Sequence, residues 1–161
     1  MGILPFRKLL EARRGADWVP PVVLLCLDPG ETTGFAVFED GHLATSGQMV
    51  GNEESSIYNQ LSNLFITIKP NRVLIEDYRI YADKANTHTW NPLITVRVIG
   101  GVEMLCAMMD IRIHYQMAST AKGFCDNTKL QAWNMYSKGN RHATDAIRHG
   151  CYFLLFNKEL K

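Results

Sequence analysis

The stretch LLCLDPGETTGFAVFEDGHL, residues 24–43, decides the fold. An apolar strand runs directly into a single acid, Asp28, and a Pro-Gly and Thr-Thr-Gly turn leads into a second apolar segment. Asp40-Gly41 is typical of a hairpin turn into a third strand. A carboxylate at the rim of an apolar sheet is costly unless a hydrogen-bonding group, a cationic side chain or a metal ion meets it. The identity of that partner for Asp28 is the first question that the sequence raises.

The apolar pattern outside this stretch predicts the remaining elements. We expect strands at 22–28, 33–39, 43–49, 72–76 and 111–115, and helices at 57–68, about 92–109, about 127–137 and from about 142 onward. Residues 77–90 have no clear period and are expected to form a loop, and 117–127 are small and polar. The order is three strands and then alternating helices and strands, which predicts three antiparallel strands followed by crossover units.

This order predicts an α/β fold with a mixed five-stranded sheet and helices on both faces, the ribonuclease H-like topology. With 161 residues the chain has room for one domain with a sizeable core. We expect a basic N-terminal arm at 1–21 and a ribonuclease H-like domain at 22–161.

Composition narrows the class of protein. The chain is 47% hydrophobic and 20% charged with a net charge of +1, so any basic surface for nucleic acid must be local. The four cysteines form no C-x-x-C pair, so we expect buried reduced thiols, no zinc, and a cytoplasmic location, in a host cell if the chain comes from a phage. The N-terminal segment has charges within its short apolar pattern, so we expect neither a secretory signal nor a membrane association.

Acidic residues end two of the predicted strands. Asp28 ends the first strand and Glu76 the fourth, and in the expected topology these strands are parallel neighbours whose carboxyl ends lie at one edge. The last helix begins RHATDAIRHG, which places His142 and Asp145 on one face. If this helix packs across the first strand, all four side chains converge.

Three carboxylates and an imidazole would repel one another without a cation, and we expect no cationic side chain among them. A divalent ion relieves the conflict, because Mg²⁺ prefers oxygen ligands and Mn²⁺ also accepts imidazole. Such a cluster suits phosphodiester hydrolysis with two metal ions. Each residue alone has a simpler interpretation, as a turn residue, a solvated strand end or an acid favoured by the helix dipole. Their agreement in order and topology favours the metal site.

These residues resemble the RuvC family of Holliday junction resolvases, especially its small phage-type members. LDPGETTGFAVFEDGHL resembles the first-strand motif of the family, VLIEDY its fourth-strand glutamate, and HATDAIRHG its closing motif, over about residues 22–156. The resemblance implies a homodimeric endonuclease that nicks a four-way DNA junction symmetrically. It implies Mg²⁺ as cofactor, with two ions per site and Mn²⁺ also active, and catalytic metal ligands at Asp28, Glu76, His142 and Asp145.

The motifs depart from the family pattern at some positions. His142 stands where many members have Asp, and Arg79 replaces an aromatic residue that bacterial members carry. We expect DNA contacts from basic and aromatic residues near the site, which are Tyr78, Arg79, Tyr81, Lys84, Lys122 and Lys129. The other histidines considered, His88, His114 and His149, are expected to be structural or solvent-facing.

Two alternatives stay open from the sequence. A nuclease of the same fold could act on forks, flaps or RNA–DNA hybrids, and a non-catalytic DNA-binding module could use the same fold. For the homodimer, the helix at 92–109 offers apolar residues beyond the need of one sheet face, namely Leu93, Val96, Ile99, Gly100 and Met104. The competing interpretation is that this helix only covers the sheet.

Overall fold

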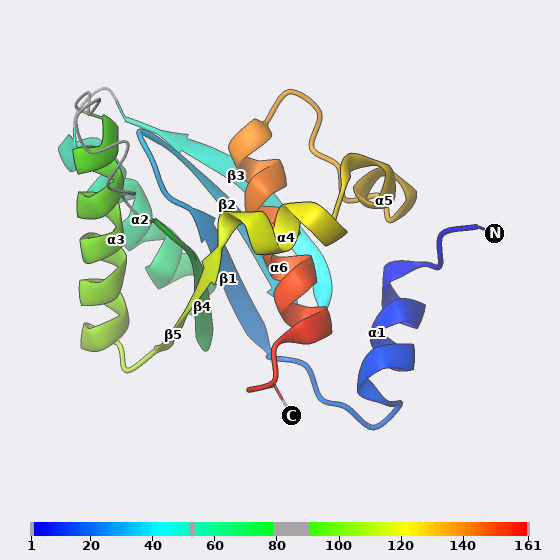
Figure 1. Ribbon diagram of the computed structural model, residues 1–161. Helices are drawn as coiled ribbons and strands as arrows, with labels where there is room; N and C mark the ends of the chain where they lie inside the picture. The colour runs from blue at the N-terminus through cyan, green and yellow to red at the C-terminus, as the bar shows by residue number, and fades with distance from the viewer. Residues whose placement is uncertain (1, 52–53, 79–90, 161) are drawn as a thin grey trace.

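A computed structural model of the protein describes residues 2–51, 54–78 and 91–160 (Figure 1). The strands are β1 (Val23–Asp28), β2 (Thr32–Glu39), β3 (His42–Val50), β4 (Arg72–Asp77) and β5 (Arg112–Met117). The helices are α1 (Phe6–Arg14), α2 (Glu54–Ile68), α3 (Asn91–Met108), α4 (Ala118–Phe124), α5 (Asn127–Ala132) and α6 (Arg141–Phe156).

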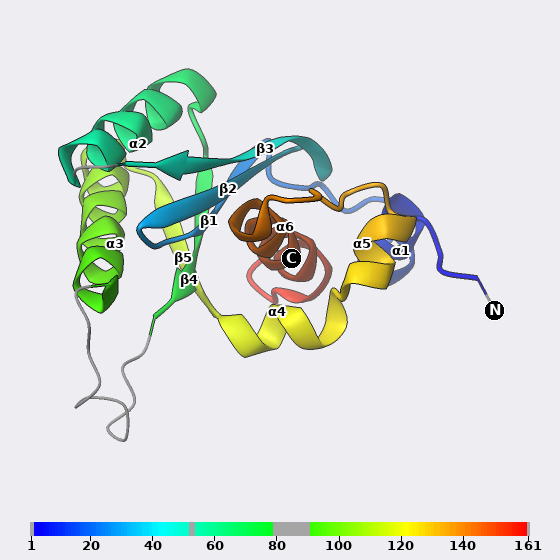
Figure 2. The same ribbon diagram turned by 90° about the horizontal axis from the view of Figure 1, so that it is seen from above.

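The five strands form one mixed sheet in the order β3-β2-β1-β4-β5. The β1–β2 and β2–β3 pairs are antiparallel, and the β1–β4 and β4–β5 pairs are parallel. Helices α2 and α3 cover one face, and α6 covers the other together with α4 (Figure 2). The predicted ribonuclease H-like fold, with helices on both faces, is confirmed.

Alternation along the strands decides which face each acid occupies. Cys26 and Leu74 belong to the core under α6, whereas their neighbours in sequence belong to the core under α2 and α3. Asp28 and Glu76 follow two residues later, so the two-residue period of a strand places both on the α6 face. Both acids follow directly after the last residue pair of the parallel β1–β4 ladder, Leu27 with Ile75.

Two glycines let α6 approach the sheet closely. Gly34 lies opposite Asp28 in the β1–β2 ladder, and a Cβ at this position would lie 2.1 Å from the backbone carbonyl of His142. At Gly150, two turns further along α6, a Cβ would lie 2.2 Å from the ring of Phe38. The first turn of α6 therefore rests on the backbone of β2, beside the end of β1.

The region after β5 differs from the sequence prediction. Helix α4 begins directly after β5, in a segment for which the sequence predicted no element, and α5 ends at Ala132 rather than near Ser137. The sequence ASTAKGF of α4 shows no helical apolar period because it buries only Ala121. The predicted loop at 77–90 falls largely outside the described residues.

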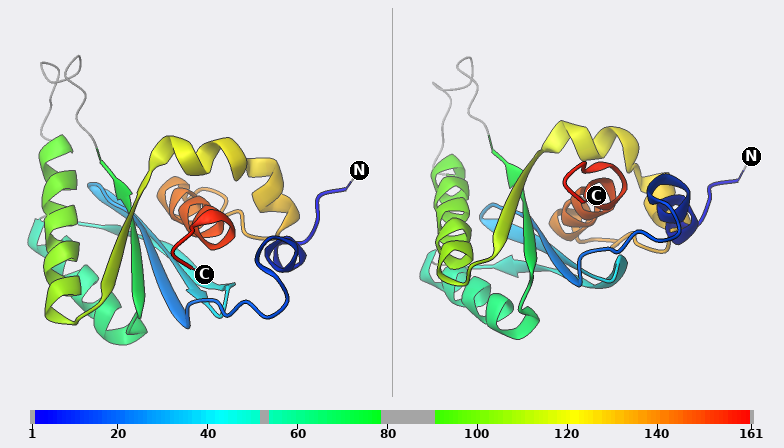
Figure 3. Two further views of the ribbon diagram at one scale, coloured as in Figure 1. Left: turned by 60° about the horizontal axis from the view of Figure 1, so that its bottom comes forward. Right: turned by 90° about the horizontal axis from the view of Figure 1, so that it is seen from below.

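Helix α1 packs on the α6 side of the sheet, close to α5 (Figure 3). The ring of Phe6 lies 5.1 Å from that of Trp133, whose indole N–H donates a hydrogen bond to the carbonyl of Leu4. Arg14 donates to the carbonyl of Leu154 at 2.7 Å, which satisfies an acceptor in the last turn of α6. The predicted basic arm thus includes a helix that contributes to the core.

All four cysteines are free and buried, as the sequence predicted, and burial raises the pKa of each thiol. Among the described residues, no helix is both long and apolar enough to span a membrane.

Replacing Gly34 with alanine tests the close approach of α6. The added methyl group collides with the backbone of His142, so we expect Gly34→Ala to lose about 1–3 kcal/mol of folding free energy. Gly123→Ala is the matched control, because no atom lies within 4 Å of its Cβ position in α4. Thermal unfolding measures both variants. An unchanged melting temperature for Gly34→Ala would contradict the tight contact.

Candidate active site

Three neighbouring elements place polar side chains at one edge of the sheet. Asp28 and Glu76 come from the carboxyl ends of β1 and β4. Helix α6 faces them with His142, Asp145 and His149, which have the i, i+3, i+7 spacing of one helix face. The four residues predicted as catalytic therefore lie at the same edge, and α6 packs across the first strand as expected.

Asp28 is the most constrained of the carboxylates. It is 8% exposed, and its Oδ2 lies 2.8 Å from Nδ1 of His142. Burial and then the negative charge of Glu76 raise the pKa of Asp28 from 3.8 to about 6, against the opposing effect of the His142 hydrogen bond. The metal-free site therefore disfavours the charged form of Asp28.

The pKa of Glu76 is shifted in the opposite direction. Burial by itself raises the pKa of Glu76, but the hydrogen bond to His149 and the charge of Lys122 outweigh it, and the pKa is lowered. Nε2 of His149 lies 2.9 Å from Oε2 of Glu76. Of the two strand-end acids, Glu76 is therefore the one held in its carboxylate form.

Asp145 is paired with two cationic side chains. Lys122 Nζ from α4 lies 3.3 Å from its Oδ2, and Arg148 bonds its Oδ1. Arg148 also donates to the side chain of Asn127 and to the carbonyl of Cys125, which fixes the guanidinium between α5 and α6. The expectation that no cationic side chain enters the cluster is thus wrong, because α4, absent from the sequence prediction, carries Lys122 to this edge.

The first turn of α6 is capped from β3. The side-chain oxygen of Gln48 accepts the backbone N–H of His142 at 3.0 Å. Thr144 donates to the carbonyls of Ser137 and Asn140 in the segment that leads into the helix. These contacts fix the turn that carries His142 relative to the sheet.

The candidate ligands engage nitrogen donors of the protein. Within the described ranges 2–51, 54–78 and 91–160, no group of three His, Cys, Asp or Glu side chains is arranged to hold a metal ion. Chemically, however, three carboxylates and one imidazole match the ligands that Mg²⁺ and Mn²⁺ accept. An ion at this edge would share the carboxylate oxygens with these nitrogen donors or displace them.

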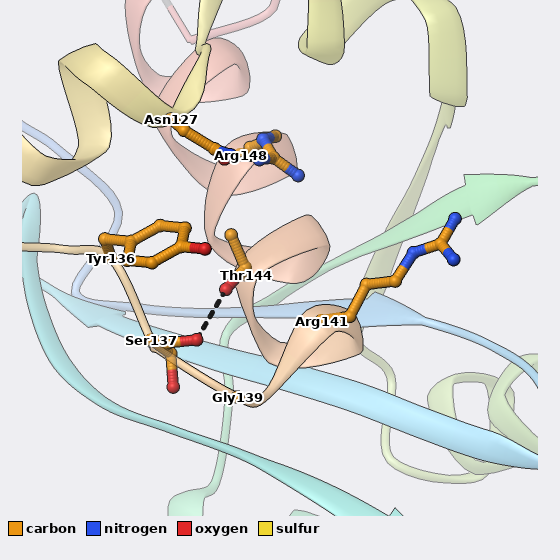
Figure 4. Close-up of a pocket in the computed structure, with 7 residues that line it drawn as sticks. All are labelled: Asn127, Tyr136, Ser137, Gly139, Arg141, Thr144 and Arg148. Atoms are coloured by element: carbon orange, nitrogen blue, oxygen red, sulfur yellow. Dashed lines mark hydrogen bonds between the residues drawn. The ribbon is translucent and has the colours of Figure 1, made fainter.

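A polar cavity lies beside Asp145. A region of about 520 Å³ is lined by Lys122, Asp126, Asn127, Thr128, Arg141, Asp145 and Arg148. A second region of about 410 Å³ shares Asn127, Arg141 and Arg148 with it. Figure 4 shows Asn127 and Arg148 together on one side of this second region, with Arg141 extending from the first turn of α6. The cavity brings three cationic side chains next to a candidate catalytic acid.

The predicted DNA-binding residues lie in different surroundings. Tyr78 directly follows β4 and is partly buried, while Arg79, Tyr81 and Lys84 lie outside the described residues. Lys122 lines the cavity. Lys129 instead bonds the carbonyl of Phe124 at 2.7 Å and the Asp126 carboxylate at 3.3 Å, so its ammonium group is engaged at the junction of α4 and α5.

Of the remaining histidines, His114 and His149 are buried, and His88 is outside the described part of the chain. His114 pairs with Glu159 at 3.0 Å, as a structural residue does. Two residues of the site were not predicted from the sequence: His149, and Gln116 on β5, whose amide nitrogen lies 2.9 Å from Nδ1 of His149. The spacing of seven residues between His142 and His149 was the sequence signal that both lie on the same face of α6.

Comparison with known proteins supports the fold. No family model matches the chain, and no curated protein matches its sequence. Solved structures do match it. RuvC of Thermus thermophilus in complex with a Holliday junction substrate has a TM-score of 0.68 at 11% identity, covering 86% of this chain and 96% of that one.

Two further resolvases align over most of their length. The yeast mitochondrial Holliday junction resolvase Ydc2 has a TM-score of 0.55 at 14% identity, covering 96% of this chain and 86% of that one. The fowlpox virus Holliday junction resolvase has a TM-score of 0.51 at 13% identity, covering 82% and 97%. At these identities the likeness establishes a shared fold.

The raised pKa of Asp28 predicts an unusual effect of pH on stability. Well below pH 3.8 its carboxyl group is protonated in both the folded and the unfolded chain, whereas above about pH 6 it must be charged in a site that disfavours the charge. We therefore expect Asp28→Asn to stabilise the metal-free protein by about 1–3 kcal/mol at pH 8 and to have little effect at pH 4.

Thermal unfolding in chelator at the two pH values measures this difference. Asp126→Asn is the control, because the backbone N–H of Lys129 lowers the pKa of that exposed carboxyl group and its neutralisation should not raise the melting temperature. A lower melting temperature for Asp28→Asn at pH 8 would mean that the His142 contact outweighs the cost of burial.

Proposed function

We propose that the protein is a metal-dependent endonuclease that resolves four-way DNA junctions by paired nicks in the phosphodiester backbone. One observation carries the proposal: Asp28, Glu76, Asp145 and His142 lie together at one edge of a ribonuclease H-like sheet. The fold is shared with structures described as Holliday junction resolvases, and this supports the choice of substrate.

Asp28, Glu76, Asp145 and His142 are the proposed ligands of Mg²⁺ or Mn²⁺. Bound metal supplies an activated water molecule and stabilises the leaving oxygen of the phosphodiester. The protein side chains hold the ligands in place before binding: His142 contacts Asp28, His149 contacts Glu76, and Lys122 contacts Asp145. These contacts keep the carboxylates converged in spite of their mutual repulsion.

The polar cavity offers a path for the DNA backbone next to the metal ligands. Lys122, Arg141 and Arg148 line it, and lysine and arginine supply most of the affinity for phosphates. Arg148 is fixed by its contacts to Asp145 and Asn127, whereas Arg141 is exposed. Tyr78, at the end of β4, is a proposed contact for an unpaired base, and Arg79, Tyr81 and Lys84, which lie outside the described residues, remain proposed DNA contacts.

The choice of a four-way junction as the substrate has a direct alternative. A nuclease for forks, flaps or RNA–DNA hybrids would use the same acids, because the metal chemistry is common to all of them. A non-catalytic DNA-binding module would not require acids buried beside the phosphate path. The small phage-type assignment within the RuvC-like resolvases is supported by the motifs of this chain.

Cleavage assays on four-way junction, fork, flap, linear duplex and hybrid substrates with matched arms test the function. We expect the junction to be cut preferentially in Mg²⁺ or Mn²⁺, with no cleavage in chelator. Asp28→Asn, Glu76→Gln and Asp145→Asn should each reduce cleavage by at least about 100-fold, the loss that even an outer contact to a metal ligand can produce. Junction binding should persist, because each change removes negative charge near the phosphates.

Equal cleavage of all the substrates would overturn the junction preference and leave a general nuclease. Binding of the junction without cleavage in any metal would favour the non-catalytic module.

Variants of His142 test whether its imidazole is a metal ligand. His142→Ala should lose most activity, whereas His142→Asp should keep part of it, because Asp offers oxygen ligands from the same position of α6. Cleavage rates across a Mn²⁺ and Mg²⁺ titration measure both variants. Normal cleavage by His142→Ala would reduce the site to three carboxylates.

A second copy of the chain is the proposed occupant of the exposed face of α3. Leu93, Val96, Gly100 and Met104 are exposed along this helix at i, i+3, i+7 and i+11. Ile99, which the sequence also predicted for this face, packs against the core under α2 and α3 instead. An apolar cavity of about 370 Å³ between α2 and α3 adjoins this face. Symmetric nicking of two opposed strands requires two matching sites, which a two-fold dimer supplies.

Val96→Glu tests the dimer. Val96 is 48% exposed, so the charge should leave the fold intact and convert dimers to monomers at micromolar concentration, as sedimentation velocity would show. Val19→Glu, the same change at a residue 82% exposed in the segment between α1 and β1, should leave the dimer unchanged. A wild-type protein that sediments only as a monomer would exclude this interface.

A further inference from the structure

His149 occupies a position that packing alone does not explain. It is 1% exposed, between the sheet and α6, and both ring nitrogens meet polar partners. Nε2 lies 2.9 Å from Oε2 of Glu76, and Nδ1 lies 2.9 Å from the amide nitrogen of Gln116. The imidazole therefore connects the end of β5 to the candidate catalytic acid at the end of β4.

The contacts of Gln116 determine which ring nitrogen carries the hydrogen. The amide nitrogen of Gln116 also lies 3.3 Å from the backbone carbonyl of His149, which can only accept a hydrogen bond. The Gln116 nitrogen is thus a donor, and an amide nitrogen cannot accept a hydrogen bond from Nδ1 of His149. Nδ1 must then be the acceptor, so the ring N–H is on Nε2 and donates to Glu76.

We infer that His149, oriented by Gln116, is a positioning residue that holds one oxygen of Glu76, so that the other oxygen faces Asp28 and the metal ion that the two acids would share. The inference rests on the proposed function, in which Glu76 is a metal ligand. Hydrogen bonds to ligating carboxylates fix their orientation and strengthen metal binding. As a neutral donor, His149 orients Glu76 without adding a positive charge next to the metal ion. Lys122, in contrast, brings a positive charge to Asp145.

Two neutral variants of similar size separate the two contacts of His149. Glutamine places its amide nitrogen near the position of Nε2 and can still donate to Glu76. Asparagine reaches only the position of Nδ1, so it can contact Gln116 but not Glu76. We expect His149→Asn to weaken binding of Mn²⁺ alone by about 10- to 100-fold and His149→Gln by less than about tenfold.

Electron paramagnetic resonance on the full chain measures the binding of Mn²⁺ without DNA. His114→Asn is the control, because His114 is a buried histidine on β5 that pairs with Glu159. It should leave the Mn²⁺ affinity unchanged. Nitrogen-15 NMR of the metal-free protein provides a second readout: Nδ1 of His149 should show the shift of an unprotonated nitrogen, and Gln116→Leu should remove this preference.

The outcomes separate this inference from the proposed function. If wild-type protein binds no Mn²⁺, or Glu76→Gln binds it equally well, the metal site itself fails and the inference fails with it. If wild type binds Mn²⁺ and Glu76→Gln does not, but His149→Asn binds like wild type, only the positioning role is overturned. A protonated Nδ1 in the NMR spectrum would also overturn it.

Discussion

Three carboxylates converge under the first turns of α6, and their burial and mutual repulsion constrain every residue around them. A buried carboxylate is stable only with hydrogen-bonding or cationic partners. The structure supplies a different nitrogen donor for each: His142 for Asp28, His149 for Glu76, and Lys122 with Arg148 for Asp145. No buried side-chain nitrogen or oxygen in the described part of the chain lacks a partner.

These partners are not equivalent. Asp28, paired with the imidazole of His142, keeps a raised pKa, whereas Glu76, near His149 and Lys122, has a lowered one. A single edge thus holds one acid that tends to be protonated and one that tends to be charged. Under the proposed function, a divalent ion removes this asymmetry because it stabilises the charged form of both.

Much of the site follows from the sequence because it depends on strand order and alternation. The acids of β1 and β4 are fixed by a two-residue period and by parallel pairing, both legible in the apolar pattern. The roles of Lys122 and His149 depend instead on where α4 lies and on how α6 is rotated. Helix α4 has no apolar period, and a lone histidine on α6 does not reveal its partner on β4, so these tertiary contacts lie beyond sequence pattern.

The difference between strand pattern and individual tertiary contacts also explains how this chain shares its fold with RuvC of Thermus thermophilus, with a TM-score of 0.68 at 11% identity. The site requires acids at the ends of two adjacent parallel strands, a small residue opposite the first of them, and polar residues on one helix turn. Gly34 is a backbone requirement, because any side chain there would displace the turn that carries His142. The two cores, one on each face of the sheet, need only apolar residues of suitable volume, which many sequences supply. The candidate site therefore depends on a few positions of this fold, namely two strand ends, the residue opposite the first of them and one face of α6.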